Sequence, residues 1–222
     1  MHPKFAEAHF NVGTILMERG DLKAAVKSLR HAHKLNPEDI DTLRNLCKTL
    51  IELDEPDQAI RVFQKVVAKN TRTPQLLLMY GIMLSELERW EASATSLRRV
   101  IRLKPEWAEA HLNLSSVLMK LDDFEGAKEV ITTCLSLEPE RAEAHSNLGN
   151  AFQKLGRWEE AISSYHKAIV LNSDLAEAHY NLGITLQSAG RPGEACISFQ
   201  KAININPKFF IAFSNMWLSI AS

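Results

Sequence analysis

Cysteine is scarce in this sequence, which has three in 222 residues, at Cys47, Cys134 and Cys196, with no CxxC pair. An odd number of widely spaced cysteines does not suit a disulfide framework or a zinc site, and it indicates a reducing compartment. The chain also lacks an apolar run near the roughly 18 residues of a transmembrane helix. Its N-terminus lacks the charged and then apolar layout of a signal peptide. We therefore expect a cytoplasmic or other reducing intracellular compartment and no membrane insertion.

Neither sign of charge dominates, because 26 lysines and arginines face 27 aspartates and glutamates, for a formal net charge of -1. This balance gives no electrostatic reason to expect nucleic acid or a membrane surface as a partner. With 45% apolar and 24% charged residues, the composition is that of a soluble, folded protein.

An internal period organises the chain. The phrase AEAH begins at Ala6, Ala108, Ala142 and Ala176, with gaps of 102, 34 and 34 residues, all multiples of 34. A fixed period of this kind is the signature of a repeat architecture. The period predicts full repeats at 6–39, 40–73, 74–107, 108–141, 142–175 and 176–209, followed by a partial repeat or capping helix at 210–222. Positions are numbered 1 to 34 within each repeat.

Each repeat predicts two helices joined by a turn. Position 8 holds a small residue throughout, namely Gly13, Cys47, Gly81, Ser115, Gly149 and Gly183. Position 20 is alanine or serine, and two helices approach closely only where neither presents bulk, so these positions predict the helix crossing. Glycine, aspartate or glutamate at position 15 suits the turn between the helices. At position 32, Pro37, Pro105, Pro139 and Pro207 predict the end of the second helix.

These features resemble the tetratricopeptide repeat, together with the aromatic residues Trp90, Phe124 and Trp158 at position 17. The resemblance covers essentially the whole chain. It implies an all-α fold, a right-handed α-α superhelical solenoid in which first helices line the concave surface and second helices the convex one. Thr71 replaces the position-32 proline, so we expect a looser junction near residues 70–74.

Both ends of the chain match parts of a repeat. Residues 2–5 align with residues 206–209, which form the tail of a repeat, and residues 210–222 supply only a first helix. The sequence therefore predicts one tetratricopeptide solenoid over 1–222 that is a piece of a longer protein.

The strongest candidate for a binding site is a row of asparagines. Positions 2, 6, 9 and 13 share a helical face distinct from the core face, and we expect them to point into the groove. Position 6 is asparagine in six of seven units, at Asn11, Asn45, Asn113, Asn147, Asn181 and Asn215. Asparagine in a helix interior costs several tenths of a kcal/mol relative to alanine, so its recurrence asks for a reason. A carboxamide can pair with a peptide unit of an extended ligand. The alternative is that these side chains bond to the adjacent repeat and only orient neighbouring helices.

This row resembles the asparagine ladder in the solenoid of O-linked N-acetylglucosamine transferase, although no part of a glycosyltransferase domain is present. Apolar residues join the same face in repeats 3 and 4, and we expect Leu78, Met79, Ile82 and Leu112 to form a pocket for a ligand side chain.

Other chemistry is not expected. Histidine occupies position 4 in four of the six repeats, at His9, His111, His145 and His179. Neighbouring repeats are stacked about a helix diameter apart, too far for a shared metal, so these are expected to be packing residues. Glu109 and Glu143 would repel a carboxylate, which excludes the two-carboxylate clamp of some tetratricopeptide domains. We expect no catalytic residues, no cofactor and no metal site.

The sequence thus predicts a protein–protein interaction module, not an enzyme, that binds an extended peptide of a protein partner in an asparagine-lined groove. One alternative is the substrate-recruiting arm of a larger glycosyltransferase- or sulfotransferase-type enzyme whose catalytic domain lies outside this chain. Another is a scaffold that self-associates through exposed solenoid ends.

Overall fold

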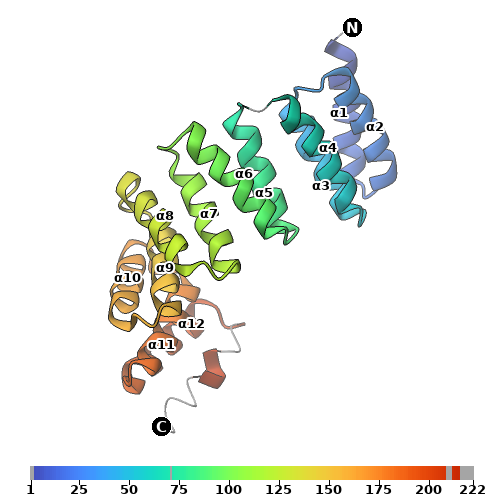
Figure 1. The fold of residues 1–222 in the computed structure, drawn as a ribbon. Helices are drawn as coiled ribbons and strands as arrows, with labels where there is room; N and C mark the ends of the chain where they lie inside the picture. Colours follow the sequence, from blue (N-terminus) through green and yellow to red (C-terminus); the bar gives the residue numbers. More distant parts are fainter. Residues whose placement is uncertain (1–2, 71, 209–211, 216–222) are drawn as a thin grey trace. The chain divides into compact units, whose positions relative to one another are not determined.

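The computed structural model describes residues 3–70, 72–208 and 212–215 (Figure 1). These residues form helices and no strand, which confirms the all-α prediction. The chain divides into two compact units, residues 1–99 and 100–222, where the sequence predicts one continuous solenoid. Thr71 and most of the predicted partial repeat or capping helix at 210–222 lie outside the described residues. No helix in the described ranges has the length and apolar character needed to cross a membrane.

Each unit is built from antiparallel helix pairs. Within the described residues, the pairs that begin in the first unit are α1 (Pro3–Glu18) with α2 (Leu22–Leu35), α3 (Ile40–Glu52) with α4 (Pro56–Lys69), and α5 (Pro74–Glu86) with α6 (Trp90–Leu103). Those of the second unit are α7 (Ala108–Lys120) with α8 (Phe124–Leu137), α9 (Ala142–Lys154) with α10 (Trp158–Leu171), and α11 (Ala176–Ser188) with α12 (Pro192–Ile205). The boundary between the units falls inside α6.

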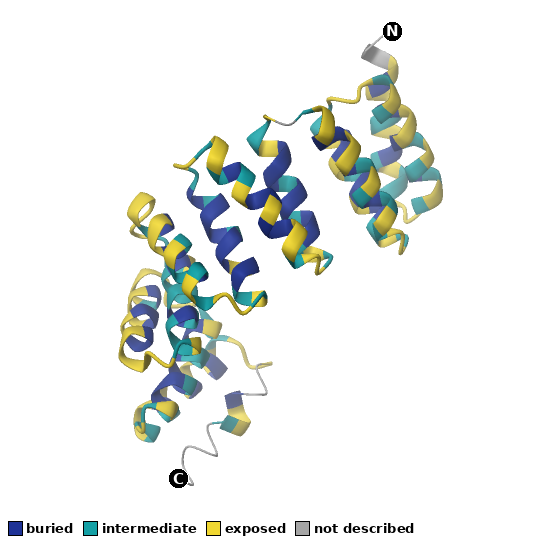
Figure 2. Ribbon diagram, viewed as in Figure 1, coloured by how far each residue is buried: buried dark blue, intermediate teal, exposed yellow. Residues whose placement is uncertain are grey.

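Helix limits follow the repeat. Helices α7, α9 and α11 begin at the alanines of the AEAH phrases, the first positions of the predicted repeats. Helix α8 ends at Leu137, two residues before Pro139, because a proline ring cannot continue a helix. Helices α1, α3, α7, α9 and α11 each pack on the second helix of their own repeat, and α7 also contacts α9, as α9 contacts α11. Hydrogen bonds from Ser93 and Ser96 join α6 to α5. Helices α5 and α7 are buried over much of their length (Figure 2).

The turn inside every repeat adopts a left-handed backbone. Position 15 has a positive φ in all six repeats, at Gly20 (78°), Asp54 (61°), Glu88 (56°), Asp122 (57°), Gly156 (72°) and Gly190 (75°). In repeat 1, the amide of Gly20 donates to the Met17 carbonyl at 2.9 Å and that of Asp21 to the Leu16 carbonyl at 2.9 Å, the pair of bonds that closes a Schellman motif. This confirms the predicted turn, and it places a non-glycine residue in a strained region in three repeats.

The predicted helix crossing at positions 8 and 20 is confirmed by direct contacts. The Ser93 hydroxyl donates to the Gly81 carbonyl at 2.7 Å, which joins position 20 to position 8. Position 8 also faces a bulky residue at position 24. A Cβ added to Gly149 would lie 2.6 Å from Cε1 of the buried Tyr165 ring. The small residues therefore make room for a large side chain as well as for the neighbouring backbone.

The position-4 histidines hold the loops between repeats. Nε2 of His111, His145 and His179 lies 2.7, 2.9 and 3.1 Å from the position-32 carbonyl oxygens of Pro105, Pro139 and Ser173. A carbonyl oxygen can only accept, so Nε2 carries the proton and donates in each case. Each histidine thereby ties a first helix to the loop that precedes it. No group of three metal-ligating side chains occurs among the described residues.

Candidate functional site

The candidate site is the face of the first helices that carries repeat positions 2, 6, 9 and 13, here called the first-helix face. In the first unit it belongs to α1, α3 and α5, and in the second unit to α7, α9 and α11. The two units each present their own part of it.

Three asparagines of position 6 donate a hydrogen bond to position 9 of the preceding repeat. The Nδ2 groups of Asn45, Asn147 and Asn181 reach Thr14 Oγ1 at 3.3 Å, Ser116 Oγ at 3.4 Å and Asn150 Oδ1 at 3.0 Å, respectively. The Thr14 hydroxyl donates its own proton to the Phe10 carbonyl oxygen at 3.1 Å, so it must accept from Asn45. These asparagines therefore link adjacent repeats, as the structural alternative in the sequence analysis expects.

The other asparagines behave differently, and position 9 explains why. The residues 31 places before Asn113 and Asn215 are Ile82 and Ile184, which have no acceptor in their side chains. Asn113 instead donates to a backbone carbonyl of its own helix at 2.9 Å. Asn215 donates to the Tyr180 hydroxyl at 3.0 Å. A polar residue at position 9 thus accepts the asparagine's bond, and where it is apolar the amide takes another partner, in its own helix for Asn113 and at Tyr180 of the preceding repeat for Asn215.

These bonds leave part of the amides for a ligand. The Oδ1 atoms of Asn45 and Asn147 accept from no donor within the described part of the chain, and both side chains are partly exposed. Asn11 is exposed. A carboxamide that donates one N–H to its neighbour keeps its carbonyl oxygen for a peptide N–H.

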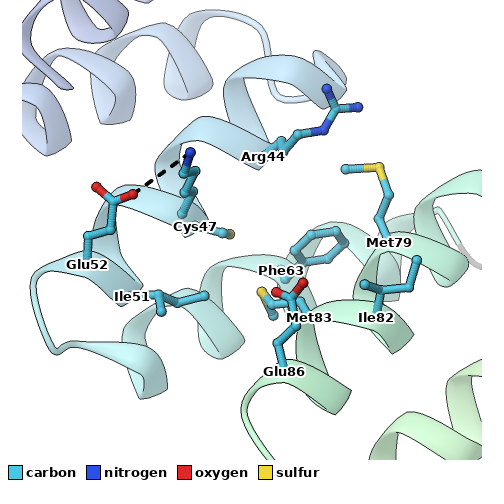
Figure 3. Close-up of a pocket in the computed structure, with 10 residues that line it drawn as sticks. Arg44, Cys47, Ile51, Glu52, Phe63, Met79, Ile82, Met83 and Glu86 are labelled. Carbon is cyan, nitrogen blue, oxygen red and sulfur yellow. Dashed lines mark ion pairs between the residues drawn. The ribbon is translucent and has the colours of Figure 1, made fainter. Parts of the chain in front are cut away.

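A cavity of about 430 Å³ opens on the first-helix face between α3 and α5 (Figure 3). Its lining comes from α3, α4 and α5 of the first unit, namely Arg44, Cys47, Lys48, Ile51, Glu52, Phe63, Met79, Ile82, Met83 and Glu86. Met79 and Ile82 are two of the apolar residues that the sequence predicts for a side-chain pocket. Figure 3 shows Phe63 between the two first helices, with Met83 beside it.

The walls of this cavity are apolar and its rim is charged. Arg44 and Lys48 lie on successive turns of α3, while Glu52 and Glu86 are the last residues of α3 and α5. The one ion pair drawn in Figure 3 joins Lys48 Nζ to Glu52 Oε1 at 3.9 Å, and a pair this exposed holds its partners by about 0–1 kcal/mol. Lys48 and Glu52 therefore lie together on the rim, and Arg44 pairs with Asp41 of its own helix at 2.8 Å.

Cys47 in the cavity wall is not suited to covalent chemistry. Burial raises the pKa of its thiol to about 12, so almost none of it is thiolate at neutral pH. Its Sγ lies 3.7 Å from the Ala59 carbonyl oxygen, to which the thiol donates.

Two residues predicted for the pocket lie elsewhere. Leu78 is 5% exposed and Leu112 is 9% exposed, so neither offers surface to a ligand. Leu112 packs with Ile131, Ala144 and other buried residues of the second unit. Position 5 falls beside the core face of the helix, and this correction separates it from positions 6 and 9, which stay partly exposed at Met79 and Ile82.

Sequence reasoning missed the position-9 acceptors and the charged rim of the cavity. The acceptors had a signal, because Thr14, Ser116 and Asn150 stand 31 residues before the asparagines that they bind. The charged rim had no signal in the sequence, since Arg44 and Glu86 come from different repeats. Only the packing of α3 and α5 places both residues on the rim of one cavity.

Tetratricopeptide repeat models match residues 16–80, 108–141 and 176–209, and a TPR repeat model matches residues 149–190. A comparison with curated proteins gives no match.

Solved structures share the fold at low identity. PilF of Pseudomonas aeruginosa is 20% identical with a TM-score of 0.71, over 98% of this chain and 97% of that chain. MamA of Desulfovibrio magneticus RS-1 is 23% identical with a TM-score of 0.67, over 75% of this chain and 94% of that one. YrrB, described as a TPR protein with an unusual peptide-binding site, is 21% identical with a TM-score of 0.65, over 85% and 97%. The family models together match most of the chain, its helix pairs repeat every 34 residues, and the chain belongs to the tetratricopeptide repeat family.

Proposed function

We propose that this protein binds an extended segment of a partner protein on its first-helix face, with one bulky apolar side chain of the partner in the cavity between α3 and α5. The observation that carries the proposal is that cavity, which combines apolar walls with an open mouth on the face expected to hold a peptide. Burying a leucine, phenylalanine or methionine side chain is worth about 1.5–3 kcal/mol, enough to make one residue dominate recognition.

The charged rim adds a preference for what flanks this anchor. Arg44 favours an acidic residue beside the anchor and Glu86 a basic one, while Lys48 and Glu52 largely offset each other. The free Oδ1 atoms of the position-6 asparagines would accept backbone N–H groups and tolerate any side chain. The family membership supports the general role, since tetratricopeptide repeats serve as protein–protein interaction modules.

Selection of displayed random peptides on the 222-residue chain tests the proposal, followed by calorimetric titration of the selected peptides. We expect the selected sequences to share a bulky apolar residue. Ile82→Gln puts a polar group in the cavity wall and should weaken these peptides about tenfold, or roughly 1.4 kcal/mol. Ile184→Gln makes the same change at position 9 of repeat 6 and serves as the matched control.

The proposal fails if the selected peptides share no apolar anchor, or if Ile82→Gln and Ile184→Gln bind them equally well. Melting curves of both variants separate lost binding from lost folding.

A second function, self-association, is favoured by a specific observation. Helix α1 exposes three large apolar residues, Phe5 (63% exposed), Val12 (48%) and Ile15 (49%). Val12→Glu with Ile15→Glu should abolish any concentration-dependent mass seen by light scattering. A mass that stays monomeric at every concentration removes this function. The alternative of a substrate-recruiting arm stays a prediction.

A further inference from the structure

Positive charge gathers on the second helices of the first unit. Helices α2 and α4 together carry seven lysines and arginines against a single acid, Asp57. The second helices of the second unit, α8, α10 and α12, carry three lysines against five glutamates. The near-neutral net charge of the chain therefore hides a local excess on one face.

A groove lies within this charged region. A cavity of about 800 Å³ between α2 and α4 is lined by Arg30, His33, Lys34, Lys65 and Lys69, here called the basic groove. Val62, Val66 and Leu46 also line it, as does one acid, Glu38. Four permanent cations thus surround a concave site whose remaining lining is partly apolar.

The lysines of the basic groove have no acidic partner. Lys34, Lys65 and Lys69 make no ion pair with any described residue. Elsewhere on the surface, arginines do find acids, as in the 2.7 Å pair of Arg157 with Glu160. Cations in the last turn of a helix stabilise its dipole, and this explains Lys34 and Lys69.

The helix dipole does not explain Lys65 or Arg30, which lie further from the helix ends. Arg30 is held in place by a 2.6 Å hydrogen bond from Nη2 to Gln58 Oε1. Nδ1 of His33 is buried and has no hydrogen-bond partner among the described residues. An anionic group in the groove would give Arg30 and Lys65 the acidic partner that neither has among the described residues.

We propose that the basic groove binds a peptide segment with clustered anionic groups, carboxylates or phosphates, from a partner protein. This second surface lies on the second helices and is independent of the first-helix face. A peptide fits better than a nucleic acid for two reasons. No phenylalanine, tyrosine or tryptophan is among the described residues that line the groove, and Glu38 would repel a continuous row of phosphates. Val62, which is partly exposed, offers an apolar contact to the peptide between its charges.

Fluorescence anisotropy with the 222-residue chain tests the inference, using three labelled peptides of one length. The first is rich in glutamate, the second carries phosphoserine at the same places, and the third carries glutamine there. We expect both anionic peptides to bind at least about tenfold more tightly than the glutamine peptide, and to weaken when ionic strength rises from about 0.01 to 0.15 M. Comparing the first two peptides tells whether carboxylate or phosphate is preferred.

Matched variants locate the site. Lys65→Glu with Lys69→Glu should weaken the anionic peptides about tenfold or more. Lys167→Glu with Lys201→Glu makes the same change in charge on α10 and α12, where both lysines occupy position 26 as Lys65 does, and should leave binding unchanged. Should the first pair fail to fold, Lys65→Gln with Lys69→Gln replaces it, and melting curves show which applies. Ile82→Gln, which tests the first-helix face, should also leave binding unchanged.

Three outcomes overturn the inference. The first is equal binding by the two charge-reversal pairs, and the second is equal binding of the glutamine peptide. The third is tighter binding of a single-stranded oligonucleotide of matched charge at the same salt concentration, which would assign the groove to nucleic acid instead.

Discussion

Replacing Gly149 with alanine adds one methyl group at the crossing of α9 and α10. That carbon would lie 2.6, 2.7 and 2.8 Å from three carbons of the Tyr165 ring, where ordinary contact begins near 3.4 Å. The ring cannot turn aside easily, because Tyr165 is fully buried and its hydroxyl donates to Asn150 Oδ1 at 2.7 Å. Overpacking of this kind costs about 1–3 kcal/mol, and the better helix propensity of alanine returns about 1 kcal/mol.

We therefore expect Gly149→Ala to lower the free energy of unfolding by up to about 2 kcal/mol, and the melting temperature accordingly by up to several degrees. Circular dichroism melting and urea titration measure both quantities. Gly193→Ala is the control, because a Cβ at Gly193 meets nothing within 4 Å. This control should melt at or slightly above the temperature of the parent protein.

A compensating change sharpens the test. Repeat 4 carries Ser115 and Ile131 at the positions that hold Gly149 and Tyr165 in repeat 5, so a Cβ at position 8 is compatible with isoleucine at position 24. Gly149→Ala should therefore cost less in a Tyr165→Ile background than in the parent. Equal costs in the two backgrounds would refute the assigned contact.

Three further predictions follow from the turns, the histidines and the asparagines. Glu88→Gly relieves the strain of a side chain in a left-handed backbone (φ 56°). Urea titration should show a free energy of unfolding raised by about 0.5–1 kcal/mol, and a lowered one would contradict the strain. Burial lowers the pKa of His179 below 6.5, so around and below that pH the unfolded chain binds more protons than the folded protein. The free energy of unfolding should therefore fall as pH drops through 6.5. Melting temperatures measured against pH should show a smaller fall for His179→Gln. Asn147→Ala and Asn181→Ala each remove a hydrogen bond between repeats and should lower the free energy of unfolding by about 0.5–1.5 kcal/mol. Asn113→Ala should be neutral or slightly stabilising. Equal melting temperatures for all three variants would show that the bonds between repeats contribute nothing.

The period of the sequence was enough to predict the helix pairs and their turns. Small residues at position 8 and prolines at position 32 are local signals. A small residue permits a close helix crossing and a proline ends a helix in whichever repeat it occurs. The same applies to the left-handed turn, which forms even where Asp54 or Glu88 replaces glycine, because the packing of the two helices requires the chain to reverse there.

The candidate site was predictable only in part, because it depends on distances between repeats. Whether Asn147 bonds to its neighbour depends on Ser116 in a different repeat. The burial of Leu112 depends on the side chains that the following repeat brings against it. The cavity beside Met79 and Ile82 depends on the spacing of α3 and α5, which no residue pattern within one repeat encodes.

The pairing of position 6 with position 9 of the preceding repeat makes the order of repeats matter. Position 9 of repeats 4 and 5 is an acceptor, Ser116 and Asn150, that the asparagine of the next repeat uses. Repeat 6 carries Ile184 at position 9. If repeats 5 and 6 were exchanged by recombination, the moved Asn147 would follow Ile184 and lose its position-9 acceptor, although every 34-residue length would be preserved. The Tyr180 hydroxyl, which Asn215 now uses, would be the acceptor that repeat 6 offers instead. An exchange of repeats therefore changes which side chain accepts the bond at a joint, even where the helices are unchanged.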